Sequence, residues 1–113
     1  MHELGLAQET LAIALDEARR QGARRILCMR LRIGDLSGVV VEALRFALET
    51  VAENTPAAGA RIEVDRVVPA CYCNQCRCEF EVQAHSYICP RCGDISLDLR
   101  RGREMDLISM EVV

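Results

Sequence analysis

The residues best suited to chemistry are four cysteines in two Cys-x-x-Cys pairs. Cys73 and Cys76 form the first pair, and Cys89 and Cys92 form the second after a spacer of residues 77–88. Two such pairs can place four thiolates at the corners of a tetrahedron, as a closed zinc site requires. Iron can bind the same ligands, and two disulfides are the metal-free alternative. Disulfides persist mainly in oxidising compartments. We expect this chain in a reducing compartment, where thiols remain free to bind metal, so the spacing predicts bound zinc.

The other cysteines and one histidine fit this pattern less well. Cys71 and Cys78 flank the first pair outside its spacing, so we expect them to pack as small apolar side chains. The alternative is that one of these two thiolates replaces a neighbouring cysteine as a zinc ligand. Cys28 lies in a predicted strand and is expected to face protein, and His85 is expected to be an exposed spacer residue.

The first three residues could form a second metal site. The α-amine of Met1, the next backbone nitrogen and Nδ1 of His2 can close two fused chelate rings around one ion. This planar set of nitrogens suits Ni²⁺ or Cu²⁺. The fourth ligand could be Glu3, another backbone nitrogen, a second protein or water. An ordinary frayed terminus is the alternative. A zinc ion held by four thiolates has no open position for substrate, so the function must lie outside the cysteines.

Two helices are predicted in the first half of the chain. Residues 4–21 place apolar side chains at spacings of three and four, and Gly22 supplies a left-handed stop. Residues 40–53 form the second helix, which is expected to bury Val41, Leu44, Leu48 and Val51.

Three strands are predicted from period-two alternation. Residues 26–33 are expected to form a strand with one buried face, because Leu27, Met29, Leu31 and Ile33 alternate with Cys28, Arg30 and Arg32. Residues 61–68 place Ile62 and Val64 inward. In residues 104–112, Ile108, Met110 and Val112 alternate with Ser109 and Glu111.

These elements predict an α+β fold in which two helices cover one face of a small three-stranded sheet. A four-cysteine module resembling a zinc ribbon is inserted before the last strand. Residues 1–70 with 104–113 would form one domain, and residues 71–103 would form the inserted zinc-binding domain. Because the insert has few apolar residues, metal binding should supply most of its folding free energy.

Composition narrows the classes of function. The chain of 113 residues has a net charge of −3 and only two tyrosines, two phenylalanines and no tryptophan, which disfavours a nucleic-acid partner. We expect no secretory leader, no membrane association and a cytoplasmic location. With no phosphate-binding glycine loop and no Ser-His-Asp set, there is no positive case for an enzyme. A zinc-ribbon adaptor and a rubredoxin-like iron electron carrier are the alternatives.

The sequence resembles the HypA/HybF hydrogenase nickel-incorporation proteins, which are small metallochaperones for [NiFe]-hydrogenase maturation. The resemblance rests on both cysteine pairs and on residues 1–7, 33–39, 42–47, 59–62 and 104–111. It implies a nickel domain with a zinc domain inserted in it. It also implies that His2 is the essential nickel ligand, assisted by the backbone at Met1 and by Glu3.

The resemblance further implies that Cys73, Cys76, Cys89 and Cys92 hold a structural zinc. Nickel would be bound weakly and transferred to the hydrogenase large subunit in concert with a GTPase of the HypB type. Some members carry an acidic residue before the second helix, where this chain has Val40; the nearest acids are Asp35 and Glu42. A monomer and a dimer that swaps its insert are both compatible with the sequence.

Overall fold

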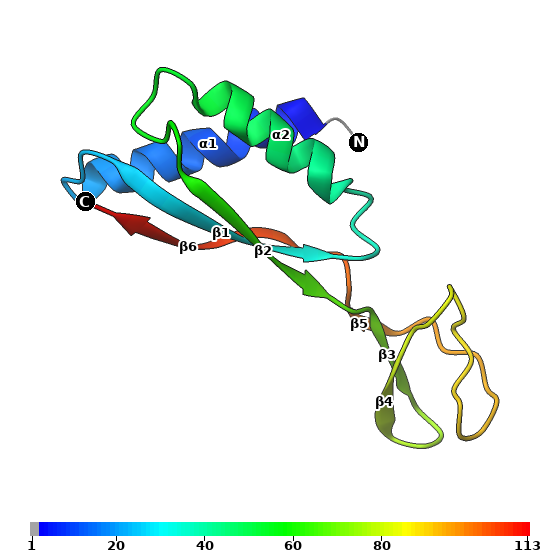
Figure 1. The fold of residues 1–113 in the computed structure, drawn as a ribbon. Helices are drawn as coiled ribbons and strands as arrows, with labels where there is room; N and C mark the ends of the chain where they lie inside the picture. Colours follow the sequence, from blue (N-terminus) through cyan, green and yellow to red (C-terminus); the bar gives the residue numbers. More distant parts are fainter. Residues whose placement is uncertain (1–2) are drawn as a thin grey trace.

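The computed structural model describes residues 3–113, and it divides them between two sheets and one helical layer (Figure 1). The two helices are α1 (Glu3–Arg20) and α2 (Val41–Ala52). The strands are β1 (Ile26–Gly34), β2 (Arg61–Val67), β3 (Ala70–Cys73), β4 (Cys78–Glu81), β5 (Leu99–Arg101) and β6 (Met105–Val112). Both predicted helices and all three predicted strands are present, each within one or two residues of its expected bounds.

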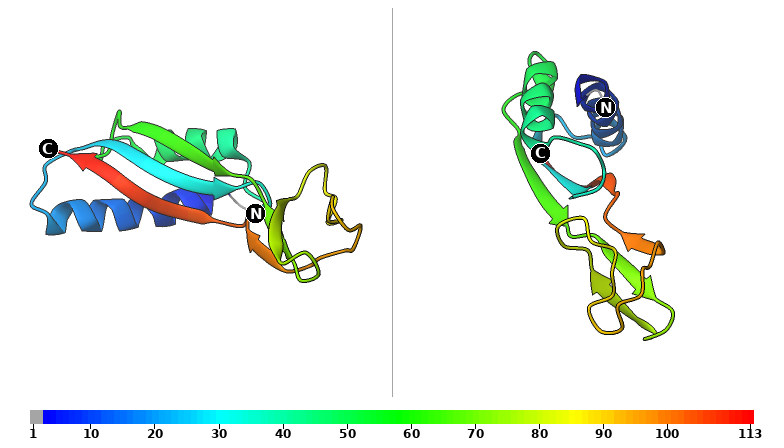
Figure 2. Two further views of the ribbon diagram at one scale, coloured as in Figure 1. Left: turned by 90° about the horizontal axis from the view of Figure 1, so that it is seen from below. Right: turned by 90° about the vertical axis from the view of Figure 1, so that its right-hand side faces the viewer.

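The first sheet has the strand order β2-β1-β6. β1 pairs in parallel with β2 and antiparallel with β6. Both helices lie on the same face of this sheet, as Figures 1 and 2 show. The predicted α+β architecture is therefore confirmed.

The main core lies between the helices and the sheet. Alanines on α1 allow the helix to approach the sheet closely, and Ala7 and Ala14 are completely buried. The larger side chains that fill the space between the layers include Met29, Leu31, Ile33, Leu44 and Leu48. Val41 and Val51 are only half-buried at the edge of this core.

Two irregularities in strand pairing overturn part of the predicted alternation. Between Ile26 and Cys28 the register with β6 shifts, and Leu27 is the extra residue. Leu27 is consequently 42% exposed while Ile26 is buried, contrary to the prediction. A second shift lies opposite Ile108, so that Leu107 rather than Ile108 packs against the core with Met110. Val112, also predicted to be inward, is 38% exposed.

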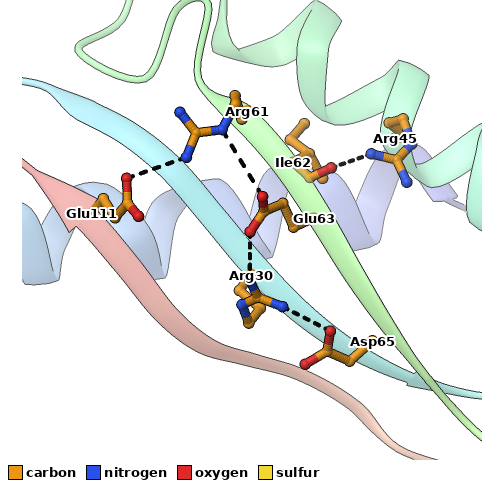
Figure 3. A network of polar contacts seen from close by, with 7 residues as sticks. All are labelled: Arg30, Arg45, Arg61, Ile62, Glu63, Asp65 and Glu111. Carbon is orange, nitrogen blue, oxygen red and sulfur yellow. Dashed lines mark hydrogen bonds and ion pairs between the residues drawn. The ribbon is translucent and has the colours of Figure 1, made fainter.

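Ion pairs cover the face of the first sheet that the helices leave open (Figure 3). Arg30 binds Glu63 at 2.6 Å and Asp65 at 2.8 Å. Arg61 reaches from β2 across β1 to Glu111 on β6, at 3.2 Å. Cys28 is in register with both Arg61 and Glu111. The bridge above it explains why Cys28 is only 3% exposed on the polar face.

The second sheet has the order β4-β3-β5 and extends from one end of the first sheet (Figure 1). Two short segments join the sheets, residues 68–69 on the way out and residues 102–104 on the way back. A Cβ at Gly34 would lie 2.1 Å from the carbonyl oxygen of Gly102, so the two backbones are in direct contact. The N–H of Leu36 donates to that same oxygen at 2.7 Å, which fixes the junction.

The molecule is elongated, with extents of 54 × 25 × 17 Å. Within residues 3–113, neither helix combines the length and the apolar character needed to cross a bilayer.

Candidate metal centre

The first cysteine pair is built on the hairpin that joins β3 to β4. Cys73 ends β3 and is paired in register with Cys78, the first residue of β4. The chain between them turns sharply, so that the N–H of Arg77 donates to the carbonyl of Cys73 at 2.7 Å. The N–H of Cys76 points at the Cys73 sulfur at 3.4 Å. This donor offsets negative charge on the sulfur when it ionises.

The second pair repeats the same turn in a loop that has no strands of its own. The N–H of Gly93 donates to the carbonyl of Cys89 at 2.9 Å, as Arg77 does to Cys73. Gly93 and Arg77 also share a left-handed backbone, with φ of +80° and +55°. Glycine adopts this conformation without strain, whereas arginine does so at a cost. The two pairs thus form equivalent turns. They differ at the left-handed position, which is glycine in the second turn and, at a cost in conformational energy, arginine in the first.

The two turns bring four sulfur atoms together. The Sγ atoms of Cys73, Cys76, Cys89 and Cys92 all lie within 4.8 Å of one another. The Cys73–Cys92 distance is 3.5 Å and the Cys76–Cys89 distance is 3.9 Å. A tetrahedral site with metal–sulfur bonds of about 2.3 Å has edges of about 3.8 Å. The cluster therefore fits a zinc ion.

The protonation chemistry of the cluster also favours a cation. Backbone N–H donation from Cys92 lowers the pKa of Cys89 to about 7. The hydrogen bond with Cys92 is the main cause that raises the pKa of Cys76 to about 12. Adjacent thiols cannot all ionise in the absence of positive charge. A divalent ion would supply that charge and hold all four as thiolates.

The remaining cysteines and His85 lie outside the sulfur cluster. Cys71 is completely buried and packs in the small core of the second sheet with Phe80 and Val82. Burial is the main cause that raises the pKa of its thiol. Cys78 is half-exposed, and His85 is exposed in the turn that follows β4.

Of the predicted nickel ligands, Met1 and His2 lie outside the described residues, and Glu3 begins α1. The Glu3 carboxylate accepts a hydrogen bond from the N–H of Val40 at 3.0 Å. Val40 is the residue that precedes α2. The two helices run parallel, so their positive N-terminal ends lie at the same end of the sheet (Figure 1). A carboxylate is therefore stabilised at the position where Glu3 lies.

Asp35 and Glu42, the acidic residues nearest to Val40 in the sequence, are each paired with an arginine. Asp35 accepts from Arg66 at 2.9 Å, and Glu42 lies 3.8 Å from Arg45. Glu42 is in the first turn of α2, where it also offsets the helix dipole.

Sequence reasoning missed two groups of residues that position the sites. Gly34 and Gly102 form the junction between the sheets, and this role is apparent only from the direct contact between their backbones. Ser96 fastens the loop after the second cysteine pair by donating from Oγ to the carbonyl of Tyr72. Arg100 stacks on the Tyr72 ring, with its guanidinium carbon 4.3 Å from the ring centroid. Gly34 lies in one of the segments that carry the family resemblance, but Gly102, Ser96 and Arg100 belong to none of them.

Comparison with known proteins gives consistent results. Residues 1–112 match the sequence pattern of a family described as "Hydrogenase/urease nickel incorporation, metallochaperone, hypA". A hydrogenase maturation factor HypA from Picosynechococcus sp. is 43% identical over 113 residues, with all of both chains covered. The corresponding factor from Chloroflexus aurantiacus is 39% identical over 112 residues, with 98% of each chain covered.

Solved structures agree in fold. The solution structure of the Ni metallochaperone HypA from Helicobacter pylori superposes with a TM-score of 0.70 at 24% identity, covering all of this chain and 98% of the other. A second solution structure, of HypA protein, gives a TM-score of 0.70 at 25% identity, covering all of this chain and 97% of the other. The family comprises metallochaperones and maturation factors and is not a family of catalytic enzymes. From the full-length sequence match and the close relatives, the chain belongs to the HypA family of hydrogenase/urease nickel incorporation metallochaperones.

Proposed function

We propose that this chain carries Ni²⁺ at its first three residues and delivers it to the large subunit of a [NiFe]-hydrogenase. The observation that carries the proposal is family membership over residues 1–112 in a chain that begins Met1-His2-Glu3. The amino group of Met1, a backbone nitrogen and Nδ1 of His2 are the nickel ligands. These nitrogens form a planar set that suits Ni²⁺.

Glu3 contributes to this site from α1. Its hydrogen bond to Val40 ties the residue after His2 to the loop before α2. The positive ends of both helices would repel a cation, and carboxylates in the first turns reduce that repulsion. Glu3 therefore makes this end of the fold more favourable for nickel, whether or not its carboxylate joins the coordination sphere.

Zinc at Cys73, Cys76, Cys89 and Cys92 serves a structural role in this proposal. The sulfur positions support it, because the cluster already has the spacing of a closed site. When bound, zinc keeps the four thiols ionised and cross-links the two turns. Residues 71–103 form the zinc-binding domain, and residues 1–70 with 104–113 form the nickel-binding domain. The separate sheets support this division.

Delivery involves a GTPase of the HypB type and takes place in the cytoplasm. Membership of a hydrogenase maturation family supports contact with that machinery. A carrier must bind its metal loosely enough to release it, and ligands that gain protons provide such a release.

The proposal is tested by comparing the metal content of protein with its native amino end and protein acetylated at its amino end. The native form is expected to hold one tightly bound zinc and one weaker nickel per chain. The acetylated form should keep zinc and lose nickel, since its terminal nitrogen is an amide and no longer a basic amine that can bind the metal. Equal nickel binding by both forms would exclude the amino group as a ligand.

A further inference from the structure

The segment between β1 and α2, residues 35–40, forms no helix or strand, yet hydrogen bonds hold almost all of its backbone. Five of its six N–H groups donate, namely those of Asp35, Leu36, Ser37, Val39 and Val40. Segments without regular structure are ordinarily among the more mobile parts of a fold. This one, which we call the bridging segment, is instead fixed in one conformation by its hydrogen bonds.

The bridging segment connects the second sheet to the amino end of the chain. Near its start, the N–H of Leu36 donates to the carbonyl of Gly102 at 2.7 Å. At its end, the N–H of Val40 donates to the Glu3 carboxylate at 3.0 Å. Gly102 lies between β5 and β6, on the return from the second sheet. A short stretch of backbone therefore joins that sheet to the residue that follows His2.

The interior of the bridging segment is held mainly by hydrogen bonds. The N–H of Ser37 donates to the carbonyl of Gly34 at 3.0 Å, and the N–H of Val39 donates to Oγ of Ser37 at 3.1 Å. Burial of apolar side chains contributes less, because Leu36 and Val39 are half-buried and Val40 is 59% exposed. A displacement at one end of the segment should therefore shift the other end.

The Gly102 end of the bridging segment has no room to move. A Cβ at Gly102 would lie 2.8 Å from Cα of Pro69, and the φ of +127° at Gly102 favours glycine. Its N–H donates to the Glu104 carboxylate at 2.8 Å. The backbone of Gly34 is in direct contact with its carbonyl. Gly102 therefore presents a fixed acceptor to Leu36.

We propose that Gly102 and the bridging segment are positioning residues for nickel binding, which they support by holding Glu3 beside Val40. This inference rests on the proposed nickel function and assigns it residues beyond the first three. Glu3 reduces the repulsion between a cation and the positive ends of both helices while it stays at this position. The second sheet thereby contributes to nickel affinity through its backbone.

The test uses zinc-loaded protein throughout, so that nickel cannot bind the four thiols. Gly102→Ala should push the acceptor carbonyl away from Leu36, and nickel affinity should fall by about fivefold, as for a carboxylate displaced from a helix end. Hydrogen exchange of the Val40 amide should become faster in the same variant. Ser37→Ala removes the acceptor of Val39 without adding atoms. It should act in the same direction, and it keeps the test decisive if Gly102→Ala fails to fold.

Gly59→Ala is the matched control, because Gly59 also has a left-handed backbone, with φ of +77°, and has no atom within 4 Å of an added Cβ. It lies in the connection between α2 and β2. The control should change nickel affinity by less than about twofold and should leave exchange of the Val40 amide unchanged. An equal loss of nickel affinity in Gly59→Ala would overturn the inference.

A double variant tests whether Gly102 acts through Glu3. Gly102→Ala combined with Glu3→Ala should bind nickel no more weakly than Glu3→Ala alone, because the two changes share one route. A further loss in the double variant, or unchanged nickel affinity in both Gly102→Ala and Ser37→Ala, would overturn the inference alone. Absence of nickel binding by the wild type would instead refute the proposed function, and the inference with it.

Discussion

The Glu3 carboxylate and the backbone N–H of Val40 join the first turn of α1 to the start of α2 at 3.0 Å. The bond spans two elements that are 37 residues apart in the chain. It places a negative charge where the positive ends of two parallel helices meet (Figure 1). Position 40 itself has no carboxylate here, and the carboxylate that binds its N–H comes from α1.

Glu3 variants can separate anchoring from nickel coordination. Glu3→Gln retains an oxygen that can accept from Val40 but loses the charge, whereas Glu3→Ala loses both. We expect Glu3→Ala to lower the free energy of unfolding by about 1 kcal/mol, as loss of a helix cap does, and Glu3→Gln to lower it less. Urea unfolding and nickel titration of both variants provide the measurement. If anchoring dominates, Glu3→Gln keeps most of the nickel affinity; if Glu3 is a required ligand, both variants lose it equally.

The zinc-binding module should unfold separately when one of its ligands is removed. Cys76→Ser is expected to lose zinc and melt the second sheet, while the first sheet and both helices persist, because each sheet has its own core. Zinc analysis and amide NMR spectra would follow the two parts. Cys78→Ser is the control and should keep its zinc. A Cys76→Ser protein with full zinc and an unchanged second sheet would contradict the proposed ligand set.

The two equivalent turns predict substitutions of opposite sign. Arg77 has φ of +55° where the other turn has Gly93, so Arg77→Gly should raise the free energy of unfolding by up to about 1 kcal/mol. Gly93→Ala should lower it by about 1–2 kcal/mol through backbone strain alone, since no atom lies within 4 Å of the added Cβ. Thermal unfolding of the zinc-loaded proteins measures both. A destabilising Arg77→Gly would show that the arginine side chain has a compensating contact.

Cys28 should resist alkylation until the ion pair above it is opened. Burial is the main cause that raises the pKa of Cys28, and the charges of Glu63 and Glu111 raise it further. Little thiolate therefore forms near pH 8. Glu111→Ala removes one such charge and opens the bridge to Arg61, so both effects should speed alkylation. Mass spectrometry of the peptide containing Cys28 gives the rate, and Glu9→Ala on α1 serves as the control.

The same pKa shift predicts how stability depends on pH. In the unfolded chain the Cys28 thiol ionises with its ordinary pKa of 9.0, while in the folded chain its raised pKa keeps it protonated to higher pH. Its contribution to stability is present below about pH 9 and is lost as pH rises through the folded pKa. Cys28→Ala should reduce this loss in alkaline unfolding curves.

Much of the fold was predictable because long periodic segments reveal which face is buried. The helix over Glu3–Arg20 and the strand over Ile26–Gly34 follow directly from such periods. The failures at Leu27 and Ile108 share one cause. A prediction from period-two alternation assumes that strand pairing is unbroken. A β-bulge inserts one extra residue and so reverses the alternation, and no residue type in the sequence signals it.

The candidate metal centre was predictable in part for a similar reason. Short spacing within each Cys-x-x-Cys pair fixes a local turn, and the structure brings the four sulfur atoms of the two turns within 4.8 Å of one another. Contacts between distant backbones carry no such pattern. The bond from Val40 to Glu3 and the packing of Gly34 on Gly102 depend on how whole elements meet, so neither could be read from residue types.

The most direct test of nickel carriage is titration calorimetry of Ni²⁺ into zinc-loaded protein with its native amino end, comparing wild type with His2→Ala and with His85→Ala. The account predicts one weak nickel site in the wild type and in His85→Ala, and none in His2→Ala, with zinc unchanged in all three. Wild-type affinity should also fall as pH drops below about 6, because imidazole and amine must release protons to bind. Unchanged nickel affinity in His2→Ala would contradict the account.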